Sequence, residues 1–178
     1  MRKLLFWSLC GATLVVYLVM ALWSLPTVSA GAGGLAPFDM RLGGYSEAEA
    51  RTFLAALTPA ASSFYRDVQH KLDLAYPALA ALTLFFAISA LLPSAWGNWR
   101  FLVAAPAIFV AIFDYLENHA VDALLLAGPD ATPTMIATAS QWTVLKSLST
   151  TVVASALLVL LIGRGVTALR QRMKRRAA

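Results

Sequence analysis

Two carboxylates follow an apolar run in the segment 113–119, and they offer the clearest chemistry in this sequence. Asp114 and Glu117 stand three residues apart, so a helix places them on one face, with Asn118 beside them. The preceding run, 101–112, is apolar, and a carboxylate buried in a membrane is costly unless another group pairs with it. Such a pair can act as general acid and base, or it can form a structural ion pair with a cation.

Other charged residues are predicted to lie at a similar height on neighbouring helices. A helical rise of about 1.5 Å per residue places four charged groups in the outer half of a hydrocarbon core about 30 Å thick. They are Asp73, Asp114, Glu117 and Lys146. Arg66, His70 and Asp73 follow one another at i, i+4 and i+7, which is one helical stripe. We therefore expect Lys146 to neutralise Asp114 or Glu117, and Arg66 to cover the outer mouth of the site.

The predicted ligand-binding set comes from three helices and comprises Arg66, His70, Asp73, Asp114, Glu117, Asn118 and Lys146. If the protein is an enzyme, the candidates for catalysis are Asp114, Glu117 and Lys146. We expect His119 and Asp122 to face the outer water. The segment around Phe38, Asp39, Arg41 and Tyr45 either folds over the mouth of the bundle or is an ordinary loop.

A metal centre is the alternative use of these residues. His70 and Asp73, like Asp114 and Glu117, have the i, i+3 spacing that presents two ligands on one helical face. A di-iron bundle needs Glu-x-x-His, however, and here His119 follows Glu117 one position too early. The single cysteine, Cys10, also argues against the paired-thiol class of membrane redox enzyme. We predict no metal and no cofactor.

The composition identifies the elements that must position these residues. The 178 residues are 60% hydrophobic and 13% charged, with a mean hydropathy of +0.71. Soluble domains carry about 25% charged residues, so an all-α integral membrane protein is predicted. Apolar runs of spanning length predict a four-transmembrane-helix bundle in one domain, with spans at 4–25, 72–92, 101–126 and 143–162. A signal peptide cleaved after Ala30 is the rival interpretation of the first run, which is long for that purpose.

The segment 26–71 is predicted to form a short helical outer segment between the first two spans. Ser46 with Glu49 three residues later is a capping box, so a short helix is expected from Glu47 to about Leu57. Pro59 suits the first turn of the next helix. Within the second span, Pro77 should produce a kink because it lacks the donor for the carbonyl of Asp73.

The basic residues predict the orientation. Lysines and arginines gather before the first span and in the tail 164–178, as the positive-inside rule requires of cytoplasmic segments. We expect a bacterial inner-membrane protein with both termini in the cytoplasm and with 26–71 and 127–142 outside. This explains the net charge of +5 without a nucleic-acid partner.

Three functions fit the sequence. The first is binding of an amphipathic ligand, such as a lipid headgroup or a quinone, in an outer polar pocket, or assistance to transport. The second is an intramembrane enzyme that uses Asp114 and Glu117 as acid and base. The third is a structural subunit that forms a homo- or hetero-oligomer through the small residues of the fourth span. Membrane lipids are partners in every case.

Overall fold

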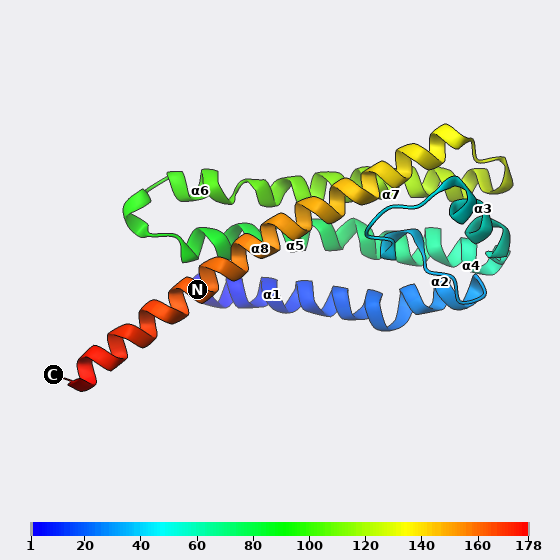
Figure 1. The fold of residues 1–178 in the computed structure, drawn as a ribbon. Helices are drawn as coiled ribbons and strands as arrows, with labels where there is room; N and C mark the ends of the chain where they lie inside the picture. The colour runs from blue at the N-terminus through cyan, green and yellow to red at the C-terminus, as the bar shows by residue number, and fades with distance from the viewer. Residues whose placement is uncertain (1, 178) are drawn as a thin grey trace.

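Every regular element that the computed structural model describes, over residues 2–177, is helical (Figure 1). Within this range, four helical stretches are long and apolar enough to cross a membrane, as in a multi-pass membrane protein. They are Lys3–Gly31, Pro59–Leu91, Trp99–Asp130 and Pro133–Arg176. The predicted all-helical architecture with four candidate spans is confirmed, although each helix is longer than the span predicted within it.

The first two stretches each contain a π turn. The first stretch consists of α1 (Arg2–Val19), the π turn η1 (Met20–Ser24) and α2 (Leu25–Gly31). The second consists of α4 (Pro59–Phe64), the π turn η3 (Tyr65–Gln69) and α5 (His70–Leu91). Helix therefore occupies both ends of the predicted outer segment 26–71. The non-spanning part, which we call the cap, is only residues 32–58.

The other two stretches are an interrupted helix and a single long one. The third consists of α6 (Trp99–Ala104) and α7 (Pro106–Ala127), and the fourth is the 45-residue α8 (Pro133–Ala177). Short 3-10 turns, η4 (Ser94–Trp96) and η5 (Gly128–Asp130), lie in the connections.

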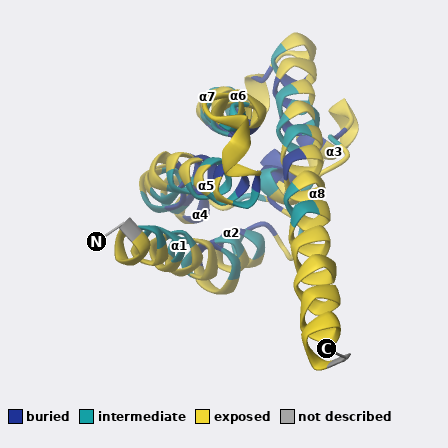
Figure 2. Ribbon diagram, turned by 90° about the vertical axis from the view of Figure 1, so that its left-hand side faces the viewer, coloured by how far each residue is buried: buried dark blue, intermediate teal, exposed yellow. Residues whose placement is uncertain are grey.

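Helix α5 lies at the centre of the bundle and packs against α1, α7 and α8, while α7 and α8 pack closely against each other. Figure 1 shows α8 crossing the bundle obliquely, with its C-terminal part extending past the other helices. That part is exposed all round, as are the outer faces of the other helices (Figure 2). Large apolar side chains such as Leu5, Trp7 and Leu22 are more than two-thirds exposed, which is the surface expected of helices facing lipid.

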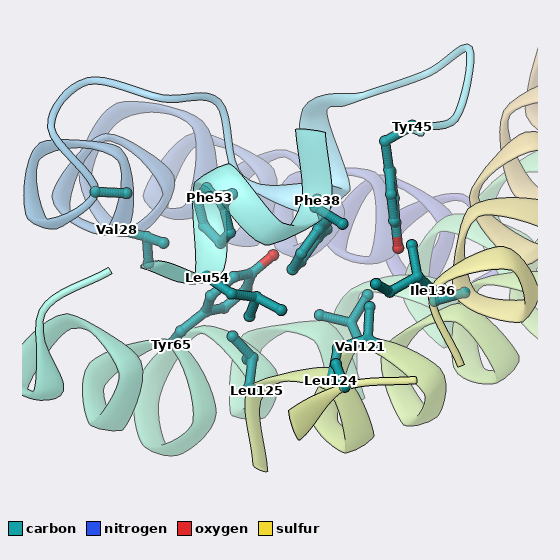
Figure 3. Packing of buried hydrophobic residues seen from close by; sticks show 14 residues of the cluster. Val28, Phe38, Tyr45, Phe53, Leu54, Tyr65, Val121, Leu124, Leu125 and Ile136 are labelled. Carbon is teal, nitrogen blue, oxygen red and sulfur yellow. The ribbon is translucent and has the colours of Figure 1, made fainter. Parts of the chain in front are cut away.

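The cap folds back onto the bundle and encloses an aromatic core (Figure 3). Phe38, in the 3-10 turn η2 (Phe38–Met40), and Phe53, in α3 (Glu47–Ala56), are fully buried and point toward Tyr65. The Arg41 guanidinium lies 5.6 Å from the Phe53 ring centroid, where a cation–π contact holds it. Of the two alternatives for the segment around Phe38 and Tyr45, the structure has the one in which the segment folds over the bundle.

The ends of the cap helix are fixed as the sequence predicts. Ser46 and Glu49 form a complete capping box, in which the Ser46 side chain accepts from the Glu49 N–H and the Glu49 carboxylate accepts from the Ser46 N–H. The Ser46 hydroxyl also donates to the Glu49 carboxylate, and this hydrogen bond together with the one from the Ser46 N–H lowers the pKa of Glu49. Thr58 caps the next helix, with Pro59 in its first turn.

One glycine allows the cap to approach α8. Gly44 has φ +81°, and a Cβ there would lie 2.7 Å from Ser140 Oγ and 2.9 Å from Val144 Cγ2. The next N–H, that of Tyr45, donates to Ser140 Oγ at 2.8 Å. We expect Gly44→Ala to lower the free energy of unfolding in mild detergent by about 2 kcal/mol or more, because it adds both a left-handed strain and a collision.

Gly43→Ala is the matched control. A Cβ at Gly43 would have no neighbour within 4 Å, and the φ of this residue is not positive. Its unfolding midpoint should stay close to that of the wild type. Equal losses for the two variants would contradict the close approach of the cap to α8.

Candidate functional site

A buried ion-pair cluster joins α7 to α8. The Lys146 ammonium contacts the Glu117 carboxylate and lies 3.4 Å from Asp114 Oδ1. Thr143 Oγ1, one helical turn before Lys146, donates to Glu117 Oε1 at 2.6 Å. Glu117 is 0% and Asp114 5% exposed, so both carboxylates depend on this lysine for neutralisation. Lys146, which we expect from the sequence to neutralise Asp114 or Glu117, contacts both.

A second polar network lies between the two π turns. Ser24, at the end of η1, donates from its hydroxyl to Gln69 Oε1, at the end of η3. The other end of the same amide, Gln69 Nε2, donates to Asp73 Oδ2 at 2.9 Å. Asp73 is 3% exposed, and within residues 2–177 no lysine, arginine or histidine nitrogen lies within 4 Å of its carboxylate. Asp73 thus has a hydrogen bond but no counterion.

Asn118 has a structural role that follows from Pro77. A proline at 77 cannot donate to the carbonyl of Asp73, four residues earlier. Asn118 Nδ2 on α7 donates to that carbonyl instead, at 3.2 Å, and the Tyr115 hydroxyl donates to the carbonyl of Leu74 at 2.9 Å. The carbonyl left free by Pro77 is therefore satisfied by a neighbouring helix, and α5 stays continuous from His70 to Leu91.

Arg66 and His70 lie on a different face from Asp73. Arg66 Nε is 3.2 Å and His70 Nδ1 3.5 Å from Asp122 Oδ1. The expected single stripe is broken for two reasons. The π turn η3 shifts the helical register by one position, and residues three apart still differ by about 60° around a helix. Arg66 therefore pairs with α7 and does not cover the mouth of the site.

A cavity of about 520 Å³ lies between the first stretch and α8, with α5 and α7 behind it. Its apolar wall includes Tyr17, Met20, Ala80, Leu84, Val110 and Leu148. Its charged residues are Asp73, Asp114 and Lys146 from the bundle and Asp39 from the cap. Three of the seven predicted ligand-binding residues line it. In the described chain, Arg66, His70, Glu117 and Asn118 are outside that lining and make the structural contacts given above.

Asp39 is the cap residue that closes the charged part of the cavity. Its Oδ2 accepts a hydrogen bond from the fully buried Tyr65 hydroxyl at 2.5 Å. Its Oδ1 is buried and, among residues 2–177, has no hydrogen-bond partner. Nearby in the cap, burial raises the pKa of the Tyr45 hydroxyl above its ordinary value.

The metal alternative requires carboxylates and histidine to converge. In the part of the chain that the structure describes, no three His, Cys, Asp or Glu side chains are grouped so as to hold a metal ion. His70 is directed to Asp122, Asp73 to Gln69, and the α7 carboxylates to Lys146. His70 and Asp73 are therefore separated by their partners, whereas Asp114 and Glu117 both face Lys146.

The ion pair predicts strong coupling between its members. Lys146→Met leaves two buried carboxylates without a cation and should cost about 3–5 kcal/mol in unfolding free energy, and Glu117→Gln should also destabilise the protein. The double variant should lose clearly less than the sum of the two single losses, as a double-mutant cycle in mild detergent will measure. Lys71→Met, at an exposed position on α5, is the control. Additive losses would show that the pair contributes no coupling.

The role of Asn118 can be tested through Pro77. Asn118→Ala should cost about 1–3 kcal/mol, because it leaves the carbonyl of Asp73 buried without a donor. In a Pro77→Ala background the new N–H supplies that donor, so the same Asn118 substitution should cost much less. Thermal unfolding of the four variants measures the difference, with the exposed His119→Ala as control. An unchanged cost in the two backgrounds would refute this account.

No family model, curated protein or solved structure matches this chain.

Proposed function

We propose that this protein binds an amphipathic ligand, such as a lipid or a quinone-like molecule, in the cavity between α1 and α8. The observation that carries the proposal is the division of the cavity into an apolar wall and a charged wall. Its volume of about 520 Å³ lies within the range of about 300–1,000 Å³ that is typical of ligand pockets. An apolar tail fits the first part, and a polar headgroup fits beneath the cap.

Exposed side chains at the rim provide a path into the cavity. Tyr17 on α1, Leu42 in the cap and Leu148 on α8 all line the cavity, and they are 50%, 67% and 57% exposed. Helices α1 and α8 diverge on this side of the bundle (Figure 2). In a membrane this opening would face lipid, so the tail of a ligand can enter from the side without crossing water.

The two π turns also support a binding function. A π turn is rare, appears mostly as a single turn within an α-helix, and is frequent at functional sites. Met20 and Ala21 of η1 line the cavity, and Gln69 of η3 holds Asp73 at its wall. Both π turns therefore contribute to the wall of the same cavity, η1 with its own residues and η3 through the hydrogen bond to Asp73.

The proposed setting is the bacterial inner membrane with the cap and residues 127–142 outside and both termini in the cytoplasm. The end of the bundle opposite the cap carries Lys3, Arg100 and the basic end of α8, in keeping with the positive-inside rule. In this orientation the cavity opens into the outer leaflet, and the basic tail lies next to anionic lipids of the inner leaflet.

The contacts of the carboxylates favour binding over acid–base catalysis. Glu117 is fully buried behind Lys146 and accepts from Thr143, so a substrate in the cavity does not reach it. Asp114 lines the cavity but faces the same lysine. We therefore assign Glu117 a structural role and keep Asp73, Asp114, Lys146 and Asp39 as the binding residues.

Filling the cavity should abolish binding. Ala80→Phe on α5 and Ala21→Phe on η1 place a ring in the cavity from opposite walls, whereas Ala78→Phe places it on the exposed side of α5. After purification in maltoside, lipids and quinones retained by each protein are quantified by mass spectrometry. We expect at least a tenfold loss in the two cavity variants and none in the control. Equal retention by all three folded variants, or none by the wild type, would contradict the proposal.

A further inference from the structure

We propose, on the basis of the proposed binding function, that the ligand of this cavity carries a positively charged amine headgroup. The ammonium would be bound by Asp39, Asp73 and Asp114. This assigns a chemical class to the headgroup, which the shape of the cavity alone does not.

The first argument is the charge balance of the cavity wall. Three aspartates line it with one lysine, and the fourth carboxylate, Glu117, lies directly behind that lysine. In the described chain Lys146 is the one lysine or arginine of the lining, and its ammonium is already shared between Glu117 and Asp114. An anionic headgroup would find no free cation here, and it would be repelled by the remaining carboxylates.

The second argument is the state of Asp73. This side chain is 3% exposed, and among residues 2–177 its carboxylate accepts one hydrogen bond, from Gln69 to Oδ2. The Ser24 hydroxyl fixes the Gln69 amide and thus the position of the carboxylate at the cavity wall. A buried carboxylate that is held in place without a cation in contact is costly unless it takes up a proton or a cation joins it. The cavity is the space from which such a cation can arrive.

The third argument is the free oxygen of Asp39 in the cap. Tyr65 holds Oδ2, while the buried Oδ1 has no hydrogen-bond partner within residues 2–177. An ammonium has three N–H donors and no acceptor, so it can satisfy oxygens on several carboxylates together. A hydroxyl or carbonyl headgroup brings fewer donors and no charge. The cap and the bundle would therefore both contact the same amine.

A set of ligands with equal chains tests this inference. Dodecylammonium, dodecanol and dodecyl sulfonate are titrated at pH 7 against the full chain in an uncharged maltoside, and affinities are corrected for partition into micelles. We expect dodecylammonium to bind about 10- to 100-fold more tightly than dodecanol, as one or two charge-assisted hydrogen bonds would give, and dodecyl sulfonate to bind most weakly. Dodecanol binding at least as tight as that of the ammonium would overturn the inference.

Variants then identify the groups responsible. Asp73→Asn and Asp39→Asn should each reduce the preference for ammonium over alcohol by tenfold or more, and dodecanol binding should not weaken. Asp67→Asn, at an exposed position in η3, should keep the wild-type preference. An unchanged preference for ammonium over alcohol in Asp73→Asn and Asp39→Asn would also overturn the inference. If one of these variants folds poorly, the same result in the other overturns it.

The outcomes separate this inference from the binding function beneath it. If dodecanol and dodecylammonium bind equally and Ala80→Phe blocks both, the cavity binds amphipaths but does not select amines. If none of the ligands binds the folded wild type, the proposed function itself fails. Putrescine, which has amines but no tail, is the last probe. Binding of putrescine as tight as that of dodecylammonium would assign the site to soluble amines and overturn the amphipathic part.

Discussion

The buried contact of Lys146 with Glu117 is the interaction on which the rest of this structure depends. A fully buried carboxylate at this depth requires a cation, and α8 supplies it, so the two helices are fixed in both register and rotation. The same face of α8 also fixes the cap. Ser140 accepts from the backbone of Tyr45, and Thr143, one turn further on, donates to Glu117. One stripe of α8 therefore links the cap to the ion pair and then to the cavity.

The π turns are the second constraint, and they act on the other side of the cavity. The two π turns lie side by side, and the side chains of Ser24 and Gln69 make contact between them. This contact is buried and polar, so it needs complete satisfaction by hydrogen bonds. Asp73 provides the acceptor at its end. The hydrogen bonds from Ser24 to Gln69 and from Gln69 to Asp73 thus offset the free-energy cost of the two π turns. This network ends at the cavity wall.

Local features of the sequence were sufficient to predict the helices, their order and the cap-helix start. The capping box at Ser46 needs only residues three apart, and the four apolar stretches need only their length. The meeting of Lys146 with the α7 carboxylates was also predictable, because unpaired charges at equal depth have few partners to choose from. The positions of Arg66 and His70 were not, because a π turn leaves no periodic signal in the sequence, and a count at 3.6 residues per turn then assigns residues to the wrong face.

The cavity itself was beyond prediction for another reason. It depends on how far α1 stands from α8 and on a loop that returns over both, which are properties of packing between distant segments. The role of Asn118 shows the same limit. The free carbonyl of Asp73 was evident from the sequence, yet its donor comes from a residue 45 positions further along the chain. The sequence places Asn118 beside the two carboxylates of α7 and therefore predicts that it binds the ligand. Its actual partner is a backbone carbonyl of α5.

The surroundings of the cavity determine which of its two parts can give specificity. In water an apolar groove attracts a hydrocarbon tail strongly, but inside a membrane the tail leaves one apolar environment for another, so the hydrophobic effect contributes little. In the proposed function, the apolar wall around Tyr17, Met20 and Leu84 would therefore admit a tail without selecting it. Selection would have to come from charged groups at the cavity wall, and these are the carboxylates of the cap and of the bundle beneath it. For this reason the charge of Asp39 and Asp73, more than the volume of the cavity, determines which molecule this protein would retain.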